Sequence, residues 1–594
     1  MKKIIKTTVS LVLSVCLIFS ISGCSQPKKN ENVQSSEIET VKEYSSQDFD
    51  EYLKELYVDI MEESDLISIH SYMEHPSDFG VNNYSKNLGR IDYDNLGSAK
   101  NYEEILNELN KYDVNTLNEK QKITYNELYK MFTNEKNNAD LYLLSTDITP
   151  TIGIHVQLPL LFAEYSFVEK KDIDEYLLLV ADVDDYFNDI LKYEKLRADA
   201  GYFLSDDLAD EVINSCNSFK DEALNDDGVM IASFNERIDK FSGLTDEEKT
   251  KYKQDNYEAV KSNVVKGYEE LATGLAALKG TNKYSGGICN YPNGSRYFEY
   301  LVNKKLGWGE SVNDLFELGE DYVDELLDEM SKIIYSDYSI SSKMSTFSFG
   351  MSDPVAMIED LKSKISADFP EIKETSYNVS YVTKSLEDYA SPAMYFIPQL
   401  DNADVNSIYI NNAGREEIYP TIAHEGYPGH LYQTQYFINS NPYWIRYVLA
   451  PRGYMEGWAS YVEVLSYSFA NTGNESLNKI MGLNYETTLI VYALGDIGVN
   501  YLGWDYNKMR EYVGQYFNFS EASYKNMYNA FIANPGNYTQ YAFGMIGIFE
   551  LREKAKDELG SKFNLKEFHR YILDMGPIQF DILFDNLEPW IKSF

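Results

Sequence analysis

Amphipathic helical periodicity constrains the fold of this chain more than any other feature. Over residues 172–200, apolar side chains recur every three or four positions, with acidic or polar residues between them. Gly201 then stands where a helix C-cap belongs, and Ser205 is placed to cap the next helix. Residues 311–333 and 454–469 repeat the pattern. The sequence therefore predicts a mainly α-helical protein.

Strand signals are confined to two short segments. Residues 393–398 (AMYFIP) and 407–410 (SIYI) are rich in aromatic and β-branched side chains, so they should form a small sheet. No internal repeat and no low-complexity linker divides residues 48–594. We therefore expect one large helical body, and we leave open whether it has two lobes around a cleft.

The first 47 residues are typical of an export signal followed by a tether. Three lysines precede an apolar stretch over 9–21, which is too short to span a bilayer. The small residues before Cys24 resemble the bacterial lipobox, in which the cysteine receives a lipid and the signal is removed. We therefore predict a signal peptide over 1–23 and a flexible polar tether over 24–47 that starts at lipidated Cys24.

The composition excludes some classes of partner. The formal net charge is −41, which argues against nucleic acid, because phosphate binding needs basic patches. Such a charge also keeps a protein soluble. Cys216 and Cys289 are the two cysteines of the expected body, too few for a disulfide framework. Whether they pair stays open, as does the oligomeric state.

The run HEGYPGH, which begins at His424, carries the strongest chemical signal. A glutamate follows the first histidine, as in the HExxH zinc peptidases. His430 is six positions on, however, and a regular helix would turn it by about 120° away from the face of His424. Pro428 must distort a helix here. We expect a bulge that returns both histidines to one face; the alternative is that they only pack or cap a kinked helix.

The predicted helix over 454–469 supplies acidic partners for the two histidines. Glu456 precedes a glycine that lets another backbone come close, and it could be the third ligand of one Zn²⁺ per chain. Glu463 lies seven residues further on, on the same face, and could orient a histidine through its other ring nitrogen. Glu425 would be the general base that takes a proton from water.

Several motifs together resemble one family. The HEGYPGH run, the EGWASYVE helix and the stretch over 535–552 are similar to the bacterial proteins called domain of unknown function 885, and the likeness extends over nearly the whole body. The resemblance implies a helical, metallopeptidase-like fold, distantly like the gluzincins, with an HExxxxH and EGW signature. It also implies that His424, His430 and Glu456 bind the metal and that Glu425 is the base.

Two further residues are candidate donors to a developing oxyanion. Tyr541 could supply its phenol, although one of 51 tyrosines is more often a packing residue. His569 could be a second donor or a buried structural histidine. The strand over 407–410 could bind an extended peptide by edge pairing.

These features favour one function and leave an alternative. The favoured function is a zinc-dependent peptidase that acts on peptides outside the cytoplasmic membrane, to which the lipid on Cys24 would hold it. The alternative is a lipoprotein that binds a peptide or solute without cutting it, or a pseudoenzyme on the same fold. A binding protein with two α/β lobes would show alternating strands and helices, and this sequence does not.

Overall fold

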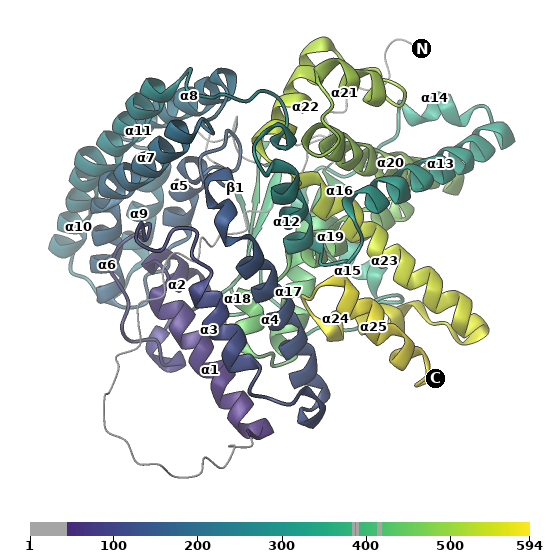
Figure 1. Ribbon diagram of the computed structural model, residues 1–594, viewed down its shortest axis with the longest axis horizontal. Coiled ribbons are helices and arrows are strands. Elements are labelled where there is room, and N and C mark those ends of the chain that lie inside the picture. The colour runs from purple at the N-terminus through teal and green to yellow at the C-terminus, as the bar shows by residue number, and fades with distance from the viewer. Residues whose placement is uncertain (1–43, 383–386, 388–390, 413–417) are drawn as a thin grey trace.

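The computed structural model describes residues 44–382, 387, 391–412 and 418–594, and the fold is mainly helical, as predicted (Figure 1). The predicted signal peptide and Cys24 lie outside the described residues. The first helix begins at Ser46, two positions before the expected start of the body. Within the described residues, no helix is both long and apolar enough to cross a lipid bilayer.

The first eleven helices build the N-terminal part of the molecule. In Figure 1, α6–α11 gather on one side of the view and α1–α4 run below them. Their bounds are α1 (Ser46–Glu63), α2 (Leu66–Tyr72), α3 (Lys100–Leu109), α4 (Glu119–Asn138), α5 (Ile154–Glu164), α6 (Lys170–Ala181), α7 (Val183–Ala200), α8 (Asp206–Glu222), α9 (Val229–Lys240), α10 (Asp246–Ala259) and α11 (Val265–Leu278).

The later helices carry the motifs that the sequence singles out. In the same view α16–α19 lie near the middle of the molecule, and α20–α25 lie beyond them (Figure 1). Their bounds are α12 (Gly294–Leu306), α13 (Val312–Ser336), α14 (Ile340–Met344), α15 (Pro354–Ile365), α16 (Tyr419–Glu425), α17 (His430–Asn439), α18 (Trp444–Val448), α19 (Arg452–Ser466), α20 (Glu475–Asn500), α21 (Tyr506–Val513), α22 (Glu521–Ala533), α23 (Asn537–Leu559), α24 (Leu565–Met575) and α25 (Phe580–Ile591).

The predicted helix over 172–200 is two helices, α6 and α7, which meet at Asp182. Asp182 keeps near-helical dihedral angles (φ −94°, ψ −7°), so the apolar periodicity continues through the break. Its carboxylate accepts a hydrogen bond from the backbone N–H of Leu88 at 2.9 Å and pairs with Arg90. These contacts come from a distant segment, which explains why the local pattern did not reveal the break. The caps at Ser205 and Gly201 are confirmed.

The sheet contains both predicted strands and one that the sequence did not reveal. The strand order is β1–β3–β2, with β1 (Asn378–Tyr381) parallel and β2 (Ala393–Phe396) antiparallel to β3 (Ser407–Ile410). The polar, half-exposed strand β1 lacks the apolar pattern that marks the other two. Because β3 is the central strand, the expectation that it binds a peptide along a free edge is wrong.

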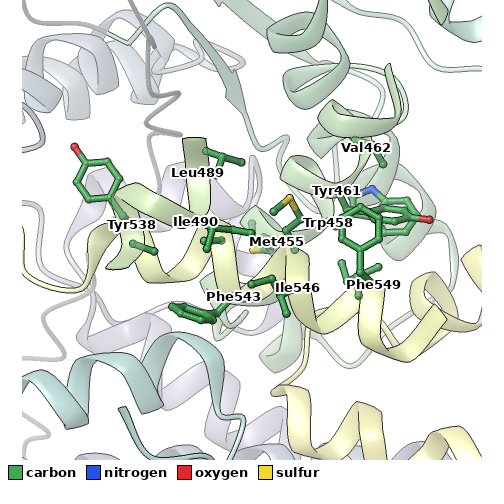
Figure 2. Close-up of a cluster of buried hydrophobic side chains, with 14 of the residues drawn as sticks. Met455, Trp458, Tyr461, Val462, Leu489, Ile490, Tyr538, Phe543, Ile546 and Phe549 are labelled. Carbon is green, nitrogen blue, oxygen red and sulfur yellow. The ribbon is translucent and has the colours of Figure 1, made fainter. Parts of the chain in front are cut away.

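Buried hydrophobic side chains form three large clusters within the described residues. The largest is built mostly by residues between 288 and 591, and α19 crosses it. Figure 2 shows where α19 meets α20 and α23: apolar side chains of the three helices come together there, namely Met455, Trp458, Tyr461, Val462, Leu489, Ile490, Tyr538, Phe543, Ile546 and Phe549.

Two glycines let α19 and α23 approach until their backbones touch. A Cβ atom added to Gly457 would lie 2.3 Å from the carbonyl carbon of Gly544. A Cβ added to Gly544 would lie 2.2 Å from the carbonyl oxygen of Gly453. No real side chain tolerates such distances without backbone movement, so this crossing requires glycine at both positions.

The substitution Gly544→Ala should therefore destabilise the protein. Overpacking of a rigid core costs about 1–3 kcal/mol, and here the obstacle is backbone, which cannot move aside. Thermal unfolding measures the effect. The control is Gly482→Ala in α20, where the added Cβ would lie at ordinary contact distances, 3.4 Å from Tyr467 Cβ and 3.5 Å from the Val464 carbonyl oxygen, so stability should stay equal or rise slightly. Equal melting temperatures for the wild type and Gly544→Ala would contradict the close crossing.

Candidate metal centre

The two histidines of the HEGYPGH run lie on separate helices. Helix α16 ends at Glu425, the Gly426–Gly429 segment forms a turn with a cis Tyr427–Pro428 bond, and His430 opens α17. The expected bulge within one helix is therefore wrong. The His424 and His430 rings still come within 4.7 Å, centroid to centroid. The complete break between α16 and α17 brings the two histidine rings together, which is what the bulge was expected to do.

The sequence of the turn explains its shape. A Cβ on Gly429 would lie 1.8 Å from the carbonyl oxygen of His424, so only glycine fits. Pro428 cannot continue the helix. Its carbonyl instead accepts a hydrogen bond from Trp458 Nε1 at 2.8 Å. Helix α19 thereby holds the turn that separates the two histidines.

Glu456 of α19 faces both histidines. Its Oε2 lies 3.5 Å from His424 Nε2 and 3.4 Å from His430 Nε2. Potential ligand atoms of the three residues all lie within 4.8 Å of one another, and the side chains are only 1–3% exposed. The structure thus brings together the three residues that the sequence suggested as ligands.

Glu463 lies two turns after Glu456 on α19 and contacts His424 from the other side. The distance from Glu463 Oε2 to His424 Nδ1 is 3.0 Å. If the ring donates its Nδ1–H to this carboxylate, the lone pair of Nε2 points to the centre, which is the tautomer that a metal ligand needs. Glu463 is therefore placed to orient His424.

Glu425 is held by the sheet. Its Oε2 accepts the backbone N–H of Tyr395, in strand β2, at 2.8 Å. Its Oε1 is buried and has no hydrogen-bond partner within the described part of the chain. Burial raises the pKa of Glu425, and the neighbouring histidines oppose the rise. One carboxylate oxygen is thus fixed and the other is available for a proton.

The centre concentrates charge away from water. Burial alone would lower the pKa of His424, but contacts with Glu456 and Glu463 outweigh it and raise the pKa to about 10. Burial alone would raise the pKa of Glu456, and the two histidines instead lower it to about 2. The carboxylates stabilise positive charge on the neighbouring imidazoles, and the same negative charge would favour a cation bound between them.

The donor set fits a zinc ion. Two imidazole nitrogens and one carboxylate oxygen are a common protein ligand set of catalytic zinc sites. Buried polar atoms normally have hydrogen-bond partners, yet His424 Nε2 has none within the described residues, because its contact with Glu456 is long. Three carboxylates also surround two imidazoles. A bound cation would satisfy the nitrogen and offset the surplus negative charge.

The two candidate oxyanion donors occupy different places. Tyr541 is buried in α23, one turn before the glycine that touches α19. His569 of α24 contacts the Tyr461 hydroxyl through Nε2 at 2.8 Å and the Asp368 carbonyl through Nδ1 at 2.6 Å. Its ring stacks on Phe369. Burial lowers the pKa of His569 to about 3. Both ring nitrogens are engaged, so His569 is a packing residue here and is not positioned as a donor to substrate.

A second buried group also gathers possible ligands. His70, Asp172 and Glu175 bring ligand atoms within 4.8 Å. Glu175 pairs with Lys86 at 2.8 Å, and Asp172 caps the first turn of α6 through Oδ2, while its Oδ1 has no hydrogen-bond partner within the described residues. His70 contacts Glu175 through Nε2 at 3.4 Å, which is consistent with a structural role.

Sequence reasoning did not find the roles of Tyr395 and Trp458. Tyr395 acts through its backbone N–H, which no residue type signals. Trp458 lies within the EGW segment, so its position was conspicuous, but its bond to the turn depends on the tertiary fold.

The fold and this centre define a helical protein with a buried His–His–Glu cluster. A family model described as "Bacterial protein of unknown function (DUF885)" matches residues 94–587. The chain therefore belongs to this family, as the sequence motifs predicted. No curated protein matches the chain.

Two solved structures resemble the whole body. One is a candidate lipoprotein from Colwellia psychrerythraea, with a TM-score of 0.78 and 20% identity, covering 92% of this chain and 100% of the other. The second is a candidate lipoprotein of unknown function from Shewanella oneidensis, with a TM-score of 0.58, 16% identity and the same coverage. At these identities the likeness shows a shared fold.

Metal content tests the centre directly. We expect protein supplied with zinc and then dialysed to retain about one zinc per chain, as a site with this ligand set would. The double variant His424→Ala, His430→Ala should lose it, and His70→Ala should keep it. Elemental analysis gives the stoichiometry. Zinc that survives the double variant, or that is lost only in His70→Ala, would contradict the assignment.

Proposed function

We propose that the protein is a zinc-dependent peptidase. One observation carries the proposal: a buried His–His–Glu donor set stands beside Glu425, whose carboxylate has one fixed and one open oxygen. Metal-assisted hydrolysis of a peptide needs a metal ion, a general base and the exclusion of bulk water, and this arrangement could supply all three.

His424, His430 and Glu456 would hold the ion. When bound, zinc supplies Lewis acidity toward a peptide carbonyl and makes a water more acidic. Glu425 takes the proton of the attacking water on its open oxygen and delivers it to the leaving amine. The Tyr395 N–H keeps that carboxylate in place throughout.

Two further residues support this chemistry in the proposal. Glu463 holds His424 in one tautomer and orientation through the 3.0 Å contact. Tyr541, on the helix that packs against α19, donates its phenolic hydrogen to the substrate oxygen as negative charge develops. His569 has no part, because its ring nitrogens are already bonded.

The proposed location is outside the cytoplasmic membrane. The predicted signal over 1–23 would be removed, and the lipid on Cys24 would tether the helical body to the membrane. Both similar solved structures are described as candidate lipoproteins, which supports this proposal. The substrates would then be peptides that the protein meets on the outer side of that membrane.

The Glu425→Gln variant tests the peptidase directly. It should keep its zinc but hydrolyse peptides roughly 10²–10⁴-fold more slowly, since it loses the proton acceptor. Cleavage of a random peptide mixture, followed by mass spectrometry, measures the rate. The control Glu511→Gln changes an exposed glutamate of α21 and should cleave like the wild type.

The outcome also separates the alternative function. A zinc-loaded wild type that binds peptides without cutting any would favour the non-catalytic binding protein. Equal cleavage by the wild type and Glu425→Gln would contradict Glu425 as the base.

A further inference from the structure

A cavity of about 210 Å³ is lined by close sequence neighbours of three residues that build the metal centre, although the two histidines, Glu425 and Glu456 are not themselves part of its lining. Met455, which immediately precedes the carboxylate ligand, lines it. Gln433 of α17, three residues after the second histidine, also lines it, as does Phe396, which follows the strand residue bonded to the candidate base. Three elements that build the centre therefore also form walls of the cavity.

The remaining walls are mostly apolar. Aromatic and aliphatic side chains line the cavity from helices far apart in the sequence, among them Leu161, Tyr165, Phe437 and Tyr447. An apolar cavity of about 150 Å³ is enough to bind benzene in another protein. The volume here therefore suits an aromatic or a large aliphatic side chain, and aromatic walls add favourable edge and stacking contacts.

Two residues of the lining also carry buried polar atoms that lack a protein partner. Gln433 is 3% exposed, and its side-chain amide nitrogen has no hydrogen-bond partner within the described residues. The Tyr165 hydroxyl is also buried without a hydrogen-bond partner within the described residues. Buried groups of this kind are costly unless a partner satisfies them.

Formal charge on the walls does not select a charged ligand. Glu164 and Arg452 line the cavity with opposite signs, and His70 is paired with Glu175. The Glu164 carboxylate accepts a hydrogen bond from the Tyr409 hydroxyl. With the charges balanced, the apolar walls decide what enters.

We propose that this cavity is the specificity pocket of the peptidase. It binds the side chain of a substrate residue next to the cleaved bond, and it selects large apolar side chains such as phenylalanine and leucine. The inference rests on the proposed function and adds the substrate class to it.

Cleavage mapping gives the first test. Zinc-loaded protein is offered N-acetylated tetraalanine amide in which phenylalanine, leucine or aspartate replaces each alanine in turn. We expect cleavage beside phenylalanine or leucine to be at least about tenfold faster than beside alanine or aspartate, the usual discrimination of an apolar pocket. Equal rates of cleavage beside all the tested side chains would overturn the inference about the pocket but would not contradict the proposed peptidase activity.

Binding gives the second test and does not depend on turnover. Calorimetry with the Glu425→Gln protein should show the phenylalanine peptide binding at least about tenfold more tightly than the alanine parent. The variant Ala450→Phe, which adds a ring to a lining residue, should remove that difference while zinc content stays the same. Leu161→Ala, which enlarges the cavity, should keep the preference for large side chains.

Cleavage and binding, measured separately, show whether the proposed pocket or the proposed peptidase activity is wrong. Selective binding that Ala450→Phe removes, without cleavage by the wild type, supports the pocket and contradicts the peptidase. Equal binding of the phenylalanine and alanine peptides, or selectivity unchanged in Ala450→Phe, overturns the pocket.

Discussion

The backbone contact between α19 and α23 fixes the position of the helix that holds most of the centre. Gly457 and Gly544 let the two helices touch, and Glu456 is the residue immediately before that contact. From the same helix, Trp458 holds the turn between α16 and α17, and Glu463 holds His424. One buried helix therefore positions a carboxylate, the turn that brings the histidines together, and one of the two rings.

Burying several carboxylates at the centre is electrostatically unfavourable, and the packing of the fold alone does not explain why they are there. Glu425, Glu456 and Glu463 are all buried beside two imidazoles. Burying charged groups is unfavourable unless they are paired, and buried pairs contribute little net stability compared with apolar packing. A helix already packed by aromatic and aliphatic side chains would gain nothing from these carboxylates as structure alone. Their burial beside the two imidazoles is what supports the proposal that this site binds a cation.

The sequence was informative where the signal is local. The EGW helix and its glutamates at seven-residue spacing follow from helical periodicity, and residue types alone suggested the histidine pair. The sequence was not informative where contacts between distant segments determine the structure. The α6–α7 break depends on contacts from Leu88 and Arg90, and β1 exists because it pairs with β3. For His569 the sequence left a donor and a buried structural histidine open, and only its neighbours favour the structural role. The cavity draws its walls from distant segments, so no local pattern could reveal it.

The most direct test is anomalous diffraction at the zinc edge from crystals of the zinc-loaded protein. A single strong peak in contact with His424, His430 and Glu456, with Glu463 still bonded to the far side of the His424 ring, is the predicted result. A map without a peak at this point, or with zinc bound only at His70, Asp172 and Glu175, would contradict the central claim that this cluster is a metal centre.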